Sequence, residues 1–151
     1  MLARVGAKPR EVRLPAQLDG LHGLIIPGGE STTIGRLLET YELLEPVRRL
    51  GAAGLPLWGT CAGLILLAKS VGHAQPLLGL MDVTVRRNAF GRQVDSFEAD
   101  LTIEGLVDGP FPAIFIRAPI VSTAGPAVKV LGRLADERIV AVRCQGCEQH
   151  K

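Results

Sequence analysis

A cysteine between two glycines is the feature of this sequence most suited to chemistry. The segment Gly59-Thr60-Cys61-Ala62-Gly63 lies where an apolar strand, Leu55 to Trp58, runs into an apolar helix that starts near Ala62. A side chain on such a sharp turn has a strained backbone, and a glycine two residues to either side removes the steric clash. The sulfur would stand clear of the sheet at a helix N-terminus, where unpaired N–H groups favour the thiolate. The pattern predicts a nucleophile elbow, and the alternative is a small buried core cysteine.

The elements before the elbow follow the same alternation of strand and helix. Leu24-Ile25-Ile26 reads as a short apolar strand closed by Pro27-Gly28-Gly29, and apolar residues from Ile34 to Tyr41 recur at helical spacing. Pro46 either kinks that helix or begins another at its first turn. After the elbow, an apolar helix is expected from Ala62 to about Val71. Strands and helices joined by glycine-rich turns predict an α/β fold, with ligands at the carboxyl ends of parallel strands.

The second half of the chain is expected to be mostly β. Alternating apolar and polar residues predict strands, and Asp108-Gly109-Pro110 and Ala124-Gly125-Pro126 read as turns. The predicted strands are Val83 to Val85, Val94 to Ile103, Ala113 to Ile116, Val128 to Leu131 and Ile139 to Val142.

Length and composition narrow the class of protein. At 151 residues the chain fits one domain, residues 1–151. A hydrophobic content of 47%, a charged content of 21% and a net charge of +2, without a basic run, argue against a nucleic-acid partner. The apolar stretches are far shorter than the roughly 20 residues of a membrane span, and the N-terminus has no apolar signal region. Three cysteines, an odd number, agree with a reducing compartment, so we expect a cytoplasmic protein.

The C-terminal residues hold one rival motif. Cys144 and Cys147 have the two-residue spacing of zinc and redox sites, and His150 follows them. A tetrahedral zinc site needs four ligands, and a redox pair is expected at the start of a helix in a βαβ unit. The sequence has neither a second cysteine pair nor such a unit here, so no metal and no cofactor are expected.

Four motifs together resemble the glutaminase subunit of pyridoxal 5'-phosphate synthase, a class I glutamine amidotransferase. Their order and spacing match over roughly residues 21–142, and the third and fourth motifs are much narrower signatures than the cysteine elbow. The motifs are Pro27-Gly28-Gly29-Glu30-Ser31-Thr32-Thr33, Gly59-Thr60-Cys61-Ala62-Gly63-Leu64, Arg87-Asn88-Ala89-Phe90-Gly91-Arg92-Gln93-Val94-Asp95-Ser96-Phe97-Glu98 and Phe115-Ile116-Arg117-Ala118-Pro119.

The resemblance implies a fold, an activity and a partner. The fold is that of class I glutamine amidotransferases, with a mostly parallel sheet flanked by helices. The implied activity is hydrolysis of L-glutamine to glutamate, with ammonia delivered to a barrel-shaped synthase subunit in a hetero-oligomer that makes the vitamin B6 cofactor. By the family's motifs, Cys61 is the nucleophile. The implied glutamine-binding residues are Gly29, Glu30, Ser31, Arg87, Ile116 and Arg117.

These assignments fit the chemistry, although each has a plainer reading. Hydrolysis of a carboxamide needs a nucleophile and donors for the oxyanion, and the backbone N–H of Ala62 is placed to be one donor. The α-ammonium and α-carboxylate of glutamine call for acidic and basic groups, which Glu30 and Arg87 supply. The plainer readings are helix capping for Glu30 and Ser31, and a solvated surface charge for an arginine.

The sequence also departs from the family's pattern. Family members begin with an apolar strand and a Leu-Gln-Gly turn, whereas this chain starts inside what would be their first helix. They also carry a His-Pro-Glu segment, a general base with its orienting carboxylate, and this sequence contains none. We expect His22, His73 and His150 to be poor substitutes, and these 151 residues alone to be inactive. The alternative function is a truncated, non-catalytic binding module that docks on the synthase subunit.

Overall fold

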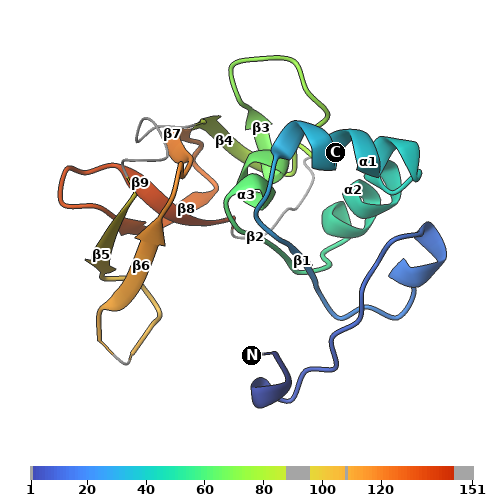
Figure 1. The fold of residues 1–151 in the computed structure, drawn as a ribbon, viewed down its shortest axis with the longest axis horizontal. Helices are drawn as coiled ribbons and strands as arrows, with labels where there is room; N and C mark the ends of the chain where they lie inside the picture. The colour runs from blue at the N-terminus through green and yellow to red at the C-terminus, as the bar shows by residue number, and fades with distance from the viewer. Residues whose placement is uncertain (1, 88–95, 108, 145–151) are drawn as a thin grey trace.

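The computed structural model describes residues 2–87, 96–107 and 109–144. Two short 3-10 helices, η1 (Leu2–Val5) and η2 (Pro15–Leu18), come first, where the resemblance implied part of a longer helix. The remaining elements form two parts, with helices at one end of the molecule and a two-stranded β-ribbon at the other (Figure 1). In chain order, the elements of the first part are β1 (Leu24–Ile26), α1 (Ser31–Thr40), α2 (Leu44–Ala52), β2 (Leu57–Gly59) and α3 (Ala62–Leu67).

Strands β1 and β2 pair in parallel, as the strand–helix–strand pattern predicted. Leu24 is opposite Leu57 and Ile26 is opposite Gly59, so both strands end at the same edge. The two helices between them are those expected from the sequence, with Pro46 in the first turn of α2. The loops after β1 and after β2 therefore leave the sheet side by side, which is what a shared site requires.

The predicted helix from Ala62 to about Val71 is too long. Helix α3 ends at Leu67, and β3 (Ala68–Ser70) follows it directly. The chain becomes extended because β3 pairs in parallel with β4 (Met81–Arg86). Backbone hydrogen bonding to β4 thus replaces the last turn of the expected helix.

The second part is built mainly from antiparallel pairs. Its strands are β5 (Phe97–Leu101), β6 (Phe111–Phe115), β7 (Ile120–Ala124), β8 (Val128–Arg133) and β9 (Ile139–Cys144). A five-stranded sheet has the order β3-β4-β7-β9-β8, and β5 pairs with β6 separately. The α/β class is confirmed, but the sheets are mixed rather than mostly parallel, because β4–β7, β7–β9 and β8–β9 all pair antiparallel. Strand β7 was not predicted, and the first residues of the predicted strand Val94 to Ile103 lie outside the described residues, as does Asp108.

Helix α3 is packed on both sides, as its all-round apolar sequence indicated. Leu66 and Leu67 join a core cluster with α1, α2 and β1, whereas Ile65 and Ala68 join a second cluster under β4 and β7. A third, smaller cluster lies beneath the β5–β6 ribbon, where the rings of Phe97 and Phe115 stack at 4.9 Å. Because α3 is fixed between two cores, the residue at its N-terminal end is held firmly.

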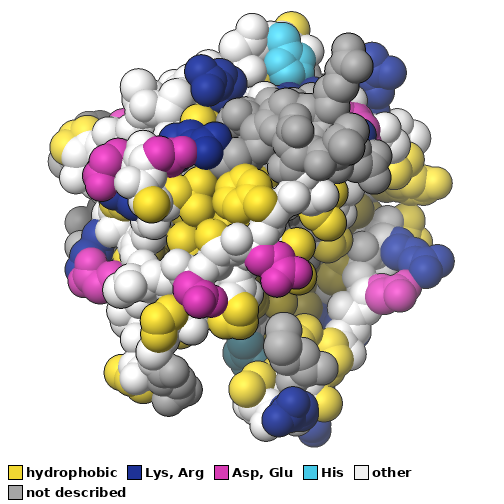
Figure 2. Space-filling model, turned by 60° about the vertical axis from the view of Figure 1, so that its left-hand side comes forward, with side chains coloured by type: hydrophobic (Ala, Val, Ile, Leu, Met, Phe, Trp, Pro, Cys, Tyr) yellow, Lys and Arg dark blue, Asp and Glu magenta, His cyan; other side chains and the backbone are white. Residues whose placement is uncertain are grey.

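The surface contains exposed apolar side chains on and beside the β5–β6 ribbon. Val107 is 93% exposed and Ile114 is 68% exposed. Figure 2, turned to bring this end of the molecule forward, shows hydrophobic side chains interspersed with acidic and basic ones. Of the helices in residues 2–87, 96–107 and 109–144, none has the length and apolar character needed to cross a membrane.

Candidate functional site

Cys61 lies on the predicted elbow. It is the second of the two residues between β2 and α3, at the N-cap position of the helix, with φ 50° and ψ −104°. Few non-glycine residues adopt a positive φ, and such strain is retained where the surrounding structure fixes it. The residue is exposed and forms no disulfide. The core-cysteine alternative is therefore wrong, and the thiol is open to a ligand.

Gly59 and Gly63 are glycines because the backbone is crowded at the elbow. A Cβ on Gly63 would lie 2.1 Å from the carbonyl oxygen of Ile26, and one on Gly59 would lie 2.4 Å from the carbonyl carbon of Gly63. Any side chain at either position would push α3 away from β1 and β2. The two glycines therefore allow the close approach that lifts Cys61 out of the sheet.

The loop that follows β1 lies directly beside Cys61. A Cβ on Gly28 would lie 3.4 Å from the Cβ of Cys61, and the Thr60 N–H donates to the Ile26 carbonyl at 3.1 Å. Gly29 is the next residue of this loop, and Glu30 begins the helix. The expectation that the cysteine turn and the glycine loop meet at one edge is confirmed.

Ala62 has the position expected of an oxyanion donor but is covered in this conformation. It is the first residue of α3 and is fully buried. Its N–H has no hydrogen-bond partner among the described residues, whereas the N–H of Gly63 is bonded to the Thr60 carbonyl at 2.9 Å. The donor is therefore unused but not open to solvent, and its role in oxyanion binding stays a prediction.

Glu30 caps helix α1. Its Oε2 accepts hydrogen bonds from the Thr33 N–H at 2.8 Å, from the Thr33 hydroxyl at 3.2 Å and from the Thr32 hydroxyl. The hydrogen bond from Thr32 is the largest cause, and with those from Thr33 and Arg87 it lowers the pKa of Glu30 from 4.5 to about 2. The capping interpretation of Glu30 is confirmed. Its second oxygen faces away from the helix.

That second oxygen binds Arg87. The Arg87 Nη2 donates to Glu30 Oε1 at 2.5 Å, and the Arg87 side chain is 28% exposed. The arginine is therefore not a solvated surface charge, and it points toward the loop after β1 as the resemblance implied. Arg87 lies at the end of β4, and the rest of its motif, residues 88–95, lies outside the described residues.

Ser31 faces the interior rather than the loop. It is 1% exposed, and its hydroxyl donates to Gln75 Oε1 at 3.2 Å. A serine hydroxyl used in this way is not free to bind a ligand. The backbone N–H of Ser31, in the first turn of α1, has no partner in the described part of the chain and is the group left to do so.

His73 and Gln75 were not predicted to belong to this region. His73 Nε2 lies 3.2 Å from Arg87 Nη1 and 3.2 Å from Gln75 Oε1, and Nδ1 lies 3.2 Å from the Val71 carbonyl oxygen. Both residues come from the segment between β3 and β4, whose sequence shows no periodicity. Only the path of that segment brings them to Arg87, so no local signal could have indicated it.

Ile116 and Arg117 follow β6 and are exposed. Arg117 has φ 47°, a strained value for a residue with a side chain. Within the described residues, no hydrogen bond or ion pair joins Arg117 to Glu30 or to the cysteine turn. The structure thus brings Arg87 into the site by direct contact, while the roles of Ile116 and Arg117 stay predictions.

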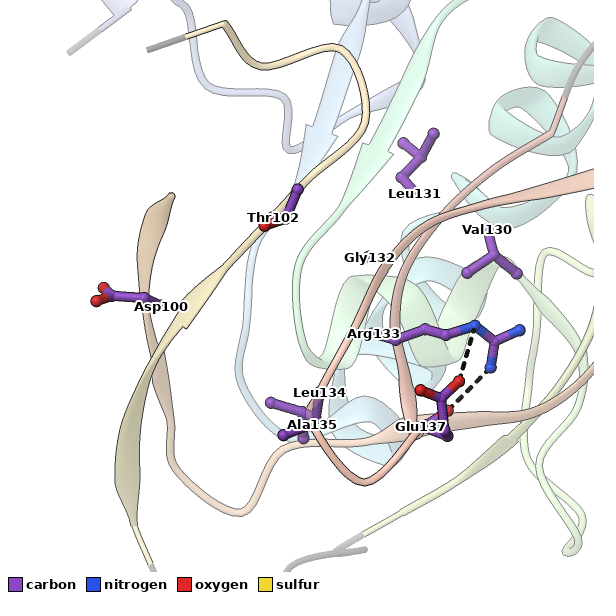
Figure 3. A pocket seen from close by; sticks show the side chains of 9 residues that line it. All are labelled: Asp100, Thr102, Val130, Leu131, Gly132, Arg133, Leu134, Ala135 and Glu137. Carbon is purple, nitrogen blue, oxygen red and sulfur yellow. Dashed lines mark hydrogen bonds and ion pairs between the residues drawn. The ribbon is translucent and has the colours of Figure 1, made fainter. Parts of the chain in front are cut away.

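Two other features lie apart from this site. A cavity of about 520 Å³ beside β8 is lined by residues that include Asp100, Thr102, Arg133 and Glu137, and none of its lining residues was predicted to bind glutamine (Figure 3). Cys144 ends β9, whereas Cys147 and His150 lie outside the described residues. In the part of the chain that is described, no three acidic, histidine or cysteine side chains gather as a metal site would require.

A comparison with protein families identifies the chain's relatives. Residues 1–149 match the model of the SNO glutamine amidotransferase family. The chain belongs to this family. As an SNO member it is 60% identical over 145 residues to the pyridoxal 5'-phosphate synthase subunit PdxT of Frankia alni, covering 94% of this chain and 72% of the relative. It is 56% identical over 147 residues to the subunit of the same name from Herpetosiphon aurantiacus, covering 95% and 77%.

A solved structure agrees with the SNO assignment. A chain described as a glutamine amidotransferase crystal structure is 51% identical, with a TM-score of 0.87, over 95% of this chain and 76% of that chain. The resemblance inferred from the four motifs is confirmed. This chain spans about three quarters of the length of these relatives.

Proposed function

We propose that this chain is the glutaminase subunit of a pyridoxal 5'-phosphate synthase, hydrolysing L-glutamine to glutamate and ammonia. The observation that carries the proposal is the exposed, strained Cys61 beside the Gly28-Gly29 loop in a member of the SNO family. The relatives named as synthase subunits support the same reaction. We also propose that residues 1–151 belong to a single glutamine amidotransferase-like domain.

The proposed chemistry proceeds through a thioester. The Cys61 sulfur attacks the carboxamide carbon of glutamine, and the carbonyl electrons move to oxygen, giving a tetrahedral oxyanion. The Ala62 N–H is the proposed donor to that oxyanion, and the covering of this N–H must shift for the contact to form. The oxyanion then re-forms the C=O bond and the C–N bond breaks. The proton given up by the Cys61 thiol passes through the general base to the departing nitrogen, which leaves as ammonia. Water attacks the thioester next, releasing glutamate and the thiol.

The glutamine main-chain groups would bind at the start of α1. Gly29, Glu30 and Ser31 supply backbone groups and a carboxylate, and Arg87 supplies the positive charge for the α-carboxylate. Two of the five guanidinium N–H groups of Arg87 are engaged, by Glu30 and by His73. Within residues 2–87, 96–107 and 109–144, the other three have no partner. Ile116 and Arg117 complete the proposed pocket on the strength of their motif.

The general base is the part of the mechanism that the described residues do not supply. His22 is exposed before β1. His73 lies against Arg87, at the end of the site that would bind the α-carboxylate, rather than against the sulfur. We therefore assign the base to a His-Pro-Glu segment of the kind that the resemblance implies, and this sequence contains no such segment.

The partner and the compartment belong to the same proposal. The relatives are named as subunits of a synthase, and we propose that the ammonia passes to a barrel-shaped synthase subunit in a hetero-oligomer, in the cytoplasm. The test is ammonia release from L-glutamine with a relative's synthase subunit present. It uses this chain extended by a relative's first strand with its Leu-Gln-Gly turn and by a relative's His-Pro-Glu segment. Cys61→Ala should abolish ammonia release. Release that survives Cys61→Ala would overturn the proposal, and binding to the synthase without any release would favour the non-catalytic alternative.

A further inference from the structure

His73 contacts Arg87 through one ring nitrogen and the main chain through the other. Its Nδ1 lies 3.2 Å from the Val71 carbonyl oxygen, and a carbonyl oxygen can only accept a hydrogen bond. With the proton on Nδ1, Nε2 is an acceptor. Its 3.2 Å approach to Gln75 Oε1 is then a contact and not a hydrogen bond, because both atoms are acceptors. Arg87 Nη1 is a donor and lies 3.2 Å from that Nε2. The tautomer fixed by Val71 is thus the one that can hold the arginine.

The anchor of this contact is rigid. Val71 is 6% exposed and belongs to the core cluster between α3 and β4. An imidazole bonded to its carbonyl has a fixed ring orientation, in the way that a hydrogen bond at one nitrogen orients the other. The Nε2 lone pair therefore points in a direction determined by the core rather than by solvent.

The guanidinium of Arg87 is consequently held at two points. Glu30 accepts from Nη2 and His73 accepts from Nη1, so the plane of the guanidinium is determined. A planar fork that is already oriented loses less side-chain freedom when it binds a carboxylate. An arginine held by Glu30 alone could still rotate about that single contact.

We propose that His73 is a positioning residue that orients Arg87 for the α-carboxylate of the substrate. This inference rests on the proposed function, because it presumes that Arg87 binds glutamine. It assigns His73 no contact with the reacting atoms. Gln75, which contacts both His73 and the Ser31 hydroxyl, connects the same segment to the first turn of α1.

The test measures glutamine binding without turnover. In the 151-residue chain, the rate at which iodoacetamide alkylates Cys61 is recorded as L-glutamine is added, and the concentration that halves the rate gives the dissociation constant. His73→Ala and His73→Phe both remove the acceptor, and Phe keeps most of the ring volume. Each should raise that constant about 2- to 10-fold, the range expected for ordering one flexible side chain. His73→Gln restores an acceptor and should recover part of the affinity.

Two controls separate positioning from general damage. His22→Ala, at an exposed histidine with no contact to Arg87 or Glu30 in the described part of the chain, should leave the constant unchanged. In the absence of ligand, the alkylation rate and the melting temperature of the His73 variants should match those of the wild type. The ligand is also varied: L-glutamine α-amide lacks the α-carboxylate, so its affinity should be the same in the wild type and in His73→Ala.

The outcomes distinguish this inference from the proposed function. An unchanged constant in His73→Ala and His73→Phe would overturn the inference alone, as would equal losses for L-glutamine and its α-amide. The effect of His73→Ala is also measured in an Arg87→Ala background. If it weakens glutamine binding there by the same factor as in the wild type, the inference is overturned, since His73 would then act without Arg87. Absence of any protection by L-glutamine in the wild type would overturn the glutamine pocket itself, and the role of His73 with it.

Discussion

Arg87 donates a hydrogen bond to Glu30, which lies 57 residues earlier in the chain. Glu30 lies in the loop after β1 of the β1–β2 sheet, whereas Arg87 directly follows β4 of the five-stranded sheet. Their ion pair therefore joins the two halves of the fold at the end of the loop whose Gly28 lies against Cys61. It also places an acid and a base next to each other, at the point where an amino acid with both charges is expected to bind.

Arg87→Ala should weaken glutamine binding, whereas the same substitution at the neighbouring Arg86 should not. A lost charge-assisted hydrogen bond to the α-carboxylate predicts a KM for L-glutamine raised about 10- to 100-fold, with kcat changed much less. Steady-state ammonia release by the extended chain with its synthase partner measures both constants. The matched control is Arg86→Ala, because Arg86 is exposed and adjacent. A KM unchanged by Arg87→Ala would remove this residue from the site.

The ionised Glu30 carboxylate should make the free energy of unfolding depend on pH. The pKa of the Glu30 carboxyl is about 2 in the folded protein and 4.5 without the folded environment, so folding favours the ionised form. The contribution is present above pH 4.5 and is lost as the pH falls toward 2. In urea unfolding, Glu30→Gln should lower the free energy of unfolding at pH 7 by about 1 kcal/mol, the typical value of a helix cap. The difference between the two proteins should shrink by pH 2.5, and a constant difference would contradict the cap.

The crowding at the elbow predicts a strong effect at Gly63. In Gly63→Ala the new Cβ would meet the Ile26 carbonyl oxygen at 2.1 Å, so α3 must move away from β1. We expect a loss of about 3 kcal/mol or more in thermal or urea unfolding, as for other severe overpacking in a core. Gly132→Ala is the control, since its nearest contact would be 3.4 Å and should cost little. Equal stability of the two variants would show that the elbow is not tightly packed.

The sequence predicted the parts of the site that depend on local geometry. The Cys61 turn and the Gly28-Gly29 loop follow from glycine spacing at the ends of apolar strands, and both lie where expected. The capping role of Glu30 could also be predicted, because an acidic side chain is favoured beside a helix N-terminus.

The parts that were missed depend on pairing between distant segments. Ala68–Ser70 continues an apolar helical pattern and becomes a strand only because β4 is available beside it. Strand β7 follows a proline and is short, so its pattern alone is weak, and it forms by pairing with β4. His73 reaches Arg87 through the path of a segment without periodic structure, which no local rule describes.

The resemblance predicts that these 151 residues, without any added segment, hydrolyse L-glutamine very slowly even when the synthase subunit is present. A positioned general base is worth about 10²- to 10⁴-fold in rate, and the His-Pro-Glu segment that would supply it is not in this sequence. Ammonia release with the synthase subunit present should rise by that factor in the extended chain. Comparable rates for the two chains would show that another group, such as His150, acts as the base.

The central claim is that Cys61 is a nucleophile aimed into a glutamine pocket. Its most direct test is labelling by 6-diazo-5-oxo-L-norleucine, a diazoketone analogue of glutamine, followed by mass spectrometry of the peptides. We predict a single adduct on Cys61, at a rate that saturates with reagent and is suppressed by L-glutamine but not by D-glutamine. Half-buried Cys144 should stay unlabelled. Labelling of Cys144 in place of Cys61, or a rate that neither saturates nor responds to L-glutamine, would contradict the account.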